Sequence, residues 1–229
     1  MKKILVAALA ALGLSVVAAP ASADLIFTLD SGSTLGSGNY GTVTLHQVAT
    51  DEVQVTVDLA SNVTFVSTGL DTFAFTLDSS IPTLTSGSFS NISPSGFTVD
   101  LTANNSDGAG TFQYALECGT ACGSGGSNPN PGPLVFDITA TGLTESSFIT
   151  NGTATFAADI CTSSNGSGCQ GATGVAFGNT GTTSGGTGTT TGGTGTTTGG
   201  TVPEPATLAL LGLGLTIIAL GRRASSKRG

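Results

Sequence analysis

The sequence has little positive charge, and none of it in the middle of the chain. All six Lys and Arg residues lie at positions 2–3 and 222–228, whereas residues 24–201 hold thirteen of the fourteen Asp and Glu residues, all but Glu204. Nucleic-acid binding and Arg clamps on anionic substrates both need Lys or Arg. The central region is therefore a polyanion, which excludes nucleic-acid partners and favours solubility and attraction of cations.

Residues that support catalysis are also scarce. His46 is the only histidine, Trp is absent, and Tyr40 and Tyr114 are the only tyrosines. His46 falls on the polar face of a predicted strand with Thr42 and Thr44, which favours a solvated residue over a catalytic base. Ser-His-Asp, Cys-His and Lys-based nucleophiles all lack parts, and sugar sites usually offer aromatic platforms. We expect no enzyme, no cofactor and no metal site.

The N-terminus has the three parts of a secretory signal. Basic residues at 2–3 precede an apolar run over 4–17 and the small-residue sequence Ala21-Ser22-Ala23. This pattern predicts a signal peptide over residues 1–23. Signal peptidase would leave Asp24 as the first residue of the exported chain.

The C-terminal segment, residues 202–229, has a second targeting pattern. Pro203-Glu204-Pro205 precedes an uncharged stretch over 206–221, and Arg222 and Arg223 follow it. A helix over 206–221 would be about 24 Å long, a little under the ~30 Å hydrocarbon core, and snorkelling arginines can close the gap. We expect a transmembrane helix whose basic end is cytoplasmic.

This order of motif, short apolar helix and basic terminus resembles the PEP-CTERM sorting signal of Gram-negative, exopolysaccharide-producing bacteria. The matching residues are Pro203, Glu204 and Pro205, followed by the helix and the Arg222/Arg223 pair. The resemblance implies recognition by an exosortase, a membrane-embedded cysteine-dependent transpeptidase, and removal of the tail. It also implies a transient stay in the inner membrane, followed by the cell surface or extracellular matrix.

The sequence pattern over residues 24–178 predicts half-buried β-strands. Apolar and polar residues alternate through Val53, Val55, Val57 and Leu59, and Gly, Asn, Ser and Pro clusters break the runs. About eight such strands predict one antiparallel β-sandwich or jelly roll. The same alternation recurs at Phe73/Phe75/Leu77, Phe97/Val99/Leu101, Phe112/Tyr114/Leu116, Leu134/Phe136/Ile138 and Phe156/Ala158/Ile160.

Residues 179–201 differ in composition. A Thr/Gly-rich heptamer repeats three times, starting at Thr180, Thr187 and Thr194. Such a stretch has nothing to bury, so it predicts a flexible tether between the β-domain and the sorting segment.

The four cysteines predict disulfides, because an exported protein meets an oxidising compartment. Three pairings are possible. We favour Cys118 with Cys122 and Cys161 with Cys169, because each pair brackets a short Gly/Ser-bearing stretch after a predicted strand. Cross-pairing of Cys118 with Cys161 remains open, whereas the spacings do not fit a Cys₄ zinc site.

Together these features predict a non-enzymatic surface or matrix protein associated with exopolysaccharide. The alternative is a β-sandwich module that binds polysaccharide or calcium at the cell surface. The Asn104–Gly108 loop offers oxygen ligands for Ca²⁺, but its composition favours an ordinary turn.

Overall fold

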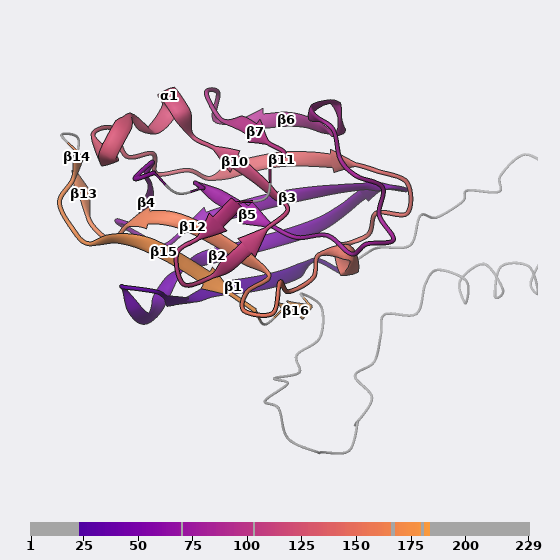
Figure 1. The fold of residues 1–229 in the computed structure, drawn as a ribbon, viewed down its shortest axis with the longest axis horizontal. Coiled ribbons are helices and arrows are strands. Elements are labelled where there is room, and N and C mark those ends of the chain that lie inside the picture. Colours follow the sequence, from indigo (N-terminus) through magenta and orange to yellow (C-terminus); the bar gives the residue numbers. More distant parts are fainter. Residues whose placement is uncertain (1–22, 70, 103, 166–167, 180, 184–229) are drawn as a thin grey trace, which may run out of the picture. The chain divides into compact units, whose positions relative to one another are not determined.

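The β-domain is built almost entirely from antiparallel strands (Figure 1). This computed structural model describes residues 23–69, 71–102, 104–165, 168–179 and 181–183. Within them the all-β prediction is confirmed, since helices are limited to single turns of three or four residues. No helix among these residues has the length and apolar character that a membrane crossing requires.

Twelve strands join in one continuous sheet. In sheet order, ten of them are β6 (Phe89–Ser93), β11 (Leu134–Thr139), β3 (Glu52–Leu59), β2 (Gly36–Ala49), β1 (Leu25–Gly32), β15 (Thr173–Gly178), β12 (Phe156–Cys161), β5 (Phe73–Phe75), β10 (Tyr114–Glu117) and β7 (Thr98–Asp100). The other two lie off this path, with β16 (Gly181–Thr183) against β1 and β4 (Thr64–Phe65) against β12.

The remaining elements are short. They are the hairpins β8–β9 (Asn104–Ser106, Gly110–Phe112) and β13–β14 (Ser164–Asn165, Gly168–Cys169), the helix α1 (Gly119–Cys122), and the 3₁₀ turns η1 (Ser86–Ser88), η2 (Ser124–Gly126) and η3 (Glu145–Ser147).

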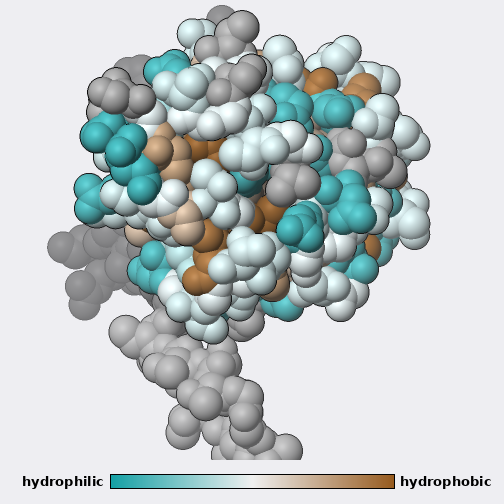
Figure 2. All heavy atoms as spheres, turned by 60° about the vertical axis from the view of Figure 1, so that its left-hand side comes forward, coloured by the Kyte–Doolittle hydropathy of each residue, from teal (hydrophilic) through white to brown (hydrophobic). Residues whose placement is uncertain are grey.

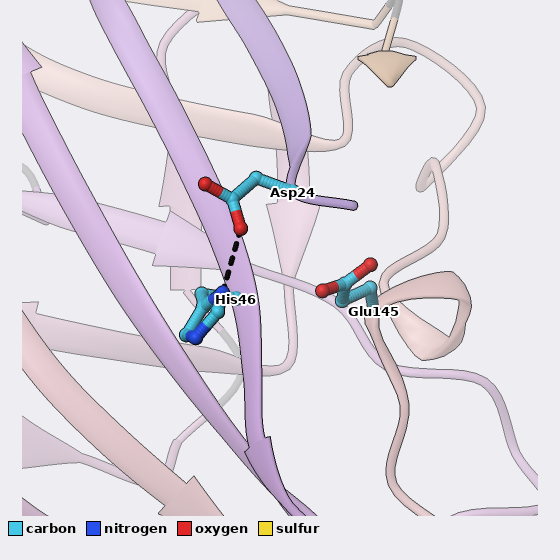
Figure 3. Close-up of side chains that lie close together, drawn as sticks. All are labelled: Asp24, His46 and Glu145. Atoms are coloured by element: carbon cyan, nitrogen blue, oxygen red, sulfur yellow. Dashed lines mark hydrogen bonds and ion pairs between the residues drawn. The ribbon is translucent and has the colours of Figure 1, made fainter. Parts of the chain in front are cut away.

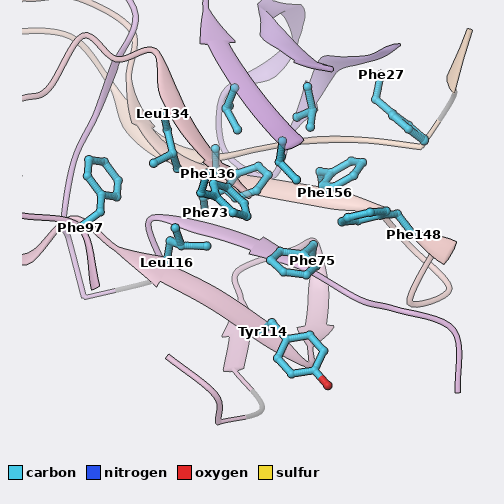
Figure 4. Close-up of a cluster of buried hydrophobic side chains, with 14 of the residues drawn as sticks. Phe27, Phe73, Phe75, Phe97, Tyr114, Leu116, Leu134, Phe136, Phe148 and Phe156 are labelled. Carbon is cyan, nitrogen blue, oxygen red and sulfur yellow. The ribbon is translucent and has the colours of Figure 1, made fainter. Parts of the chain in front are cut away.

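The sheet folds over so that its two halves face each other across an aromatic core (Figure 4). The ring of Phe136, on β11, lies 6.0 Å from that of Phe73 and 6.2 Å from that of Phe75, both on β5. The ring of Phe156, on β12, lies 5.8 Å from Phe73 and 4.9 Å from Phe27. Burial of each Phe side chain contributes about 1.5–3 kcal/mol, so these rings are a large part of the hydrophobic stabilisation of the fold.

The predicted alternation holds on β3, where Val53, Val55 and Val57 are fully buried and the residues between them are partly exposed. On β12, by contrast, all six residues are buried. A second apolar cluster covers the outer face of that strand. Its members are mostly small: Ala74, Ala109, Phe112, Ala115, Ala154, Ala157 and Val175.

The structure differs from the sequence prediction in two further respects. In place of two separate sheets there is one, because β1 is hydrogen-bonded to both β2 and β15 and so joins the two halves. The tether was expected to begin at residue 179, but Gly181–Thr183 pair with Leu25–Phe27. The β-domain therefore extends at least to Thr183.

Several predictions fall on other parts of the chain. The signal peptide up to residue 22, the tether from residue 184 onward and the sorting segment with its helix over 206–221 lie outside the described residues.

Candidate functional site

Three side chains with ligating groups gather beside the start of β1 (Figure 3). We call Asp24, His46 and Glu145 the Asp24 group. His46 Nδ1 lies 2.6 Å from Asp24 Oδ1, and the potential ligand atoms of all three residues lie within 4.8 Å of one another. Within the described residues, no other set of three His, Cys, Asp or Glu side chains meets this distance. The His46 and Asp24 side chains are 48% and 37% exposed, so the group is open to solvent.

Strand register brings the first two members together. Leu25 on β1 pairs with Leu45 on β2, which places Asp24 beside His46 on the neighbouring strand. Leu45 is fully buried, and successive side chains on a strand point to opposite faces. His46 therefore points outward, as the sequence predicts, but its carboxylate partner could not be identified without the register.

Glu145 joins them from a distant part of the sequence. The Gln47 backbone N–H donates to Glu145 Oε1 at 2.8 Å, and Gln47 Nε2 donates to the Leu143 carbonyl at 3.2 Å. The Thr144 N–H donates to Ser147 Oγ at 3.0 Å, which closes the η3 turn around Glu145. These bonds hold η3 against the end of β2, so the Glu145 carboxylate faces the other two side chains.

A second acidic group lies where β5, β10 and β7 run side by side. Asp71 precedes β5 and is 7% exposed, while the half-buried Glu117 ends β10. Burial, and then the neighbouring Asp71 carboxylate, raise the pKa of Glu117 to about 7. Burial also raises the pKa of Asp71, and a hydrogen bond with Glu117 partly offsets this. At pH values below about 7 the protonated form of Glu117 therefore predominates, and its O–H donates a hydrogen bond to the Asp71 carboxylate.

We call these two residues the Asp71–Glu117 pair. Its geometry suits proton sharing rather than sugar hydrolysis. The two carboxyl groups of a glycosidase stand about 5 Å or more apart, with the substrate between them. Here the two groups are hydrogen-bonded to each other.

Two further carboxylates are buried without Lys or Arg partners. Asp159 Oδ2 accepts hydrogen bonds from the Thr68 N–H at 2.9 Å and hydroxyl at 2.6 Å, and burial raises the pKa of Asp159. Asp137 is 4% exposed and accepts from the side-chain amides of Gln54 at 2.9 Å and Asn91 at 2.5 Å. The domain thus stabilises its inner carboxylates with neutral donors and protons.

The four cysteines lie in the pairing that the sequence favours. Cys118 and Cys122 form one disulfide, across α1, and Cys161 and Cys169 form the other. The described residues include no free cysteine. This pairing excludes the alternative in which Cys118 forms a disulfide with Cys161.

The remaining predicted site residues are those of the sorting motif and of the Asn104–Gly108 loop. Pro203, Glu204, Pro205, Arg222 and Arg223 lie outside the described residues. The Asn104–Gly108 segment belongs to the β8–β9 hairpin, with the Ala109 N–H donating to the Ser106 carbonyl at 2.8 Å. Asn104–Ser106 form β8, and residues 107–109 form the turn.

An all-β domain with paired cysteines is typical of proteins that work outside the cytoplasm. Comparison with known families then supplies a more specific assignment. Residues 201–227 match the model of the PEP-CTERM protein-sorting motif, which confirms the resemblance found in the sequence. The chain is thus an exported protein that carries an exosortase sorting signal. Neither the curated proteins nor the solved structures yield a match.

Proposed function

We propose that the protein is a non-enzymatic component of the cell surface or extracellular matrix, which displays its β-domain after an exosortase has processed the tail. The match of residues 201–227 to the PEP-CTERM motif carries this proposal. Signal peptidase and exosortase act in turn on the two ends of the chain. The inner membrane holds the intermediate, and the host is a Gram-negative bacterium that makes exopolysaccharide.

The chemistry of the described residues supports a role without catalysis. His46 is hydrogen-bonded to Asp24, and within the described residues no hydrogen bond joins its ring to a Ser, Thr or Cys side chain. The Asp71–Glu117 pair is closed on itself by a hydrogen bond. Among the residues that the structure describes, neither His46 nor the Asp71–Glu117 pair forms part of a set of nucleophile, base and stabilising donor, which acyl or glycosyl transfer would require.

The surface supports display rather than sugar binding through aromatic platforms. Ten of the eleven Phe residues and both Tyr residues are buried, and Phe177 is half-buried. On the face shown in Figure 2, residues of intermediate hydropathy cover much of the surface, and hydrophobic residues appear in small groups. Such a surface, with net negative charge, favours a soluble domain.

The test is fractionation of a host that carries an exosortase. Wild-type protein should reach the cell surface or the matrix fraction with a mass reduced by loss of the tail. Glu204→Ala should stay in the membrane fraction with the tail attached. Asp58→Asn, which removes one exposed carboxylate outside the motif, is the charge-matched control and should behave as wild type. Identical mass and fractionation of wild type and Glu204→Ala would exclude exosortase sorting.

A further inference from the structure

The geometry points to a divalent transition-metal site at the Asp24 group, with zinc as the best-matched ion. The ligands are the His46 imidazole and the carboxylates of Asp24 and Glu145. This inference goes beyond the sorting function and does not depend on it. It also revises the expectation, drawn from the sequence, that the protein has no metal site.

The set of donors selects the class of ion. An imidazole nitrogen with two carboxylate oxygens suits Zn²⁺ and related transition metals, whereas Ca²⁺ and Mg²⁺ prefer oxygen ligands alone. Three protein ligands leave a fourth position for water or another ligand, as in zinc sites that remain open to solvent. Cleavage after Ala23 would add the α-amino nitrogen of Asp24, which can form a six-membered chelate ring with the carboxylate of the same residue.

The distances allow a metal ion with small side-chain movements. Metal–ligand bonds of about 2.0–2.2 Å in a tetrahedral site place the ligand atoms roughly 3.3 Å apart. The candidate ligand atoms already lie within 4.8 Å of one another. The His46 and Asp24 side chains are 48% and 37% exposed, so they can turn without disturbing the core.

A bound metal ion would replace the direct contact between His46 Nδ1 and Asp24 Oδ1, which lie 2.6 Å apart. Three independent parts of the fold hold the ligands. Asp24 precedes β1, His46 lies on β2, and the Gln47 N–H holds Glu145 from η3. The site is thus assembled only in the folded domain, so metal binding should stabilise the fold.

The lack of Lys and Arg around the Asp24 group also favours a bound cation. Residues 24–201 contain no Lys or Arg, so the single imidazole is the only side chain of this region that can carry positive charge. It is hydrogen-bonded to one carboxylate and has a second close by. A bound divalent cation would offset both carboxylates, whereas a protonated imidazole offsets only one.

The test uses protein produced from the full-length sequence, recovered after export and purified without a polyhistidine tag. Calorimetry with ZnCl₂ should give one site per chain. A hundredfold excess over the Kd should raise the melting temperature by about 5–10 °C. CaCl₂ at equal ionic strength should give a much smaller rise. His46→Gln should abolish the zinc-specific rise, and Asp24→Asn and Glu145→Gln should each weaken zinc binding at least tenfold, while Asp58→Asn should leave it unchanged.

A second measurement needs no substitution. Because the chain has one histidine, its imidazole NMR signals are unambiguous, and they should shift in proportion to zinc until one equivalent is bound. Absence of stoichiometric zinc binding, unchanged imidazole signals, or a zinc-specific rise that survives in folded His46→Gln would each overturn the proposal. The His46–Asp24 contact would then be an exposed ion pair and nothing more.

Discussion

The Asp24 group and the Asp71–Glu117 pair bring carboxylates together in a domain without Lys or Arg, but in opposite surroundings. In the first, the side chains of Asp24 and His46 are more than a third exposed, and the imidazole approaches a carboxylate at 2.6 Å. In the second, Asp71 is 7% exposed, and the charge is limited by a proton on Glu117, whose pKa is raised to about 7.

The comparison indicates that access to solvent decides how this domain neutralises neighbouring carboxylates. At the surface, water reduces the repulsion, and a cationic partner can enter and leave. In the interior, desolvation makes a second negative charge more costly than retaining a proton. The exposed group should therefore respond to metal ions, and the buried pair to pH.

The largest expected effect comes from removing the disulfide next to the buried pair. Cys118 and Cys122 are fully buried, and Cys118 directly follows Glu117. The double variant Cys118→Ser/Cys122→Ser should lose about 2 kcal/mol of unfolding free energy, the low end of the usual range because the loop is short. It should also lose part of the pH dependence, since Glu117 becomes more hydrated.

Urea unfolding at pH 5 and pH 8 measures both the unfolding free energy and its dependence on pH. Cys161→Ser/Cys169→Ser is the matched control, since it removes a disulfide that does not adjoin Glu117 in sequence. This control should lose a similar free energy but keep the pH dependence of wild type. Equal pH dependence in the wild type and in both double variants would show that the first disulfide does not maintain the burial of Glu117.

The next effect concerns the proton on Glu117 itself. Its pKa rises from an ordinary 4.5 in the unfolded chain to about 7 in the fold. Below pH 4.5 the carboxyl group is protonated in both states, so its favourable contribution is fully present there. That contribution is lost as the pH rises through 7, because the unfolded state releases the proton first. After allowance for partial exposure, the loss is about 1–2 kcal/mol.

Glu117→Gln should remove most of this loss, because a neutral amide can still donate a hydrogen bond to Asp71 at high pH. Chemical denaturation from pH 4.5 to 8 should therefore give a flatter stability curve for the variant, with the largest gain over wild type at pH 8. Asp58→Asn should run parallel to wild type. If Glu117→Gln is less stable than wild type at pH 8, repulsion between ionised Asp71 and Glu117 does not destabilise the wild-type fold at that pH.

Much of the fold could be predicted from the sequence because strand alternation is a local property. The buried faces of β3 and β11 and the favoured disulfide partners follow from patterns within a few residues. The buried outer face of β12 could not be predicted, since the small Ala157 and the charged Asp159, which lie between Phe156 and Ile160, give no signal of burial. The joining of the two halves through β1 depends on pairing between distant strands.

Neither acidic group could be found from the sequence. His46 was correctly placed on an exposed strand face, but its partners are 22 and 99 positions away, and only register and the docking of η3 bring them close. Asp71 and Glu117 meet because β5 and β10 pair with Leu116 opposite Phe73. The local pattern of residues does not indicate which carboxylates share a proton.

The smallest expected effect is that of salt on the exposed carboxylates, such as Asp30, Asp58 and Asp107. Repulsion between exposed charges decays over about 8–10 Å at physiological ionic strength, whereas interactions between buried groups are screened much less. Raising NaCl from ~0.05 to ~0.5 M should therefore increase the melting temperature by only about 1–3 °C. The increase should be the same in wild type and in Glu117→Gln, because it does not arise from the buried pair. CaCl₂ at equal ionic strength should match NaCl if screening is the cause. A larger rise with calcium that disappears in Asp107→Asn would instead place a calcium site at the β8–β9 turn and add a third kind of carboxylate group to the comparison.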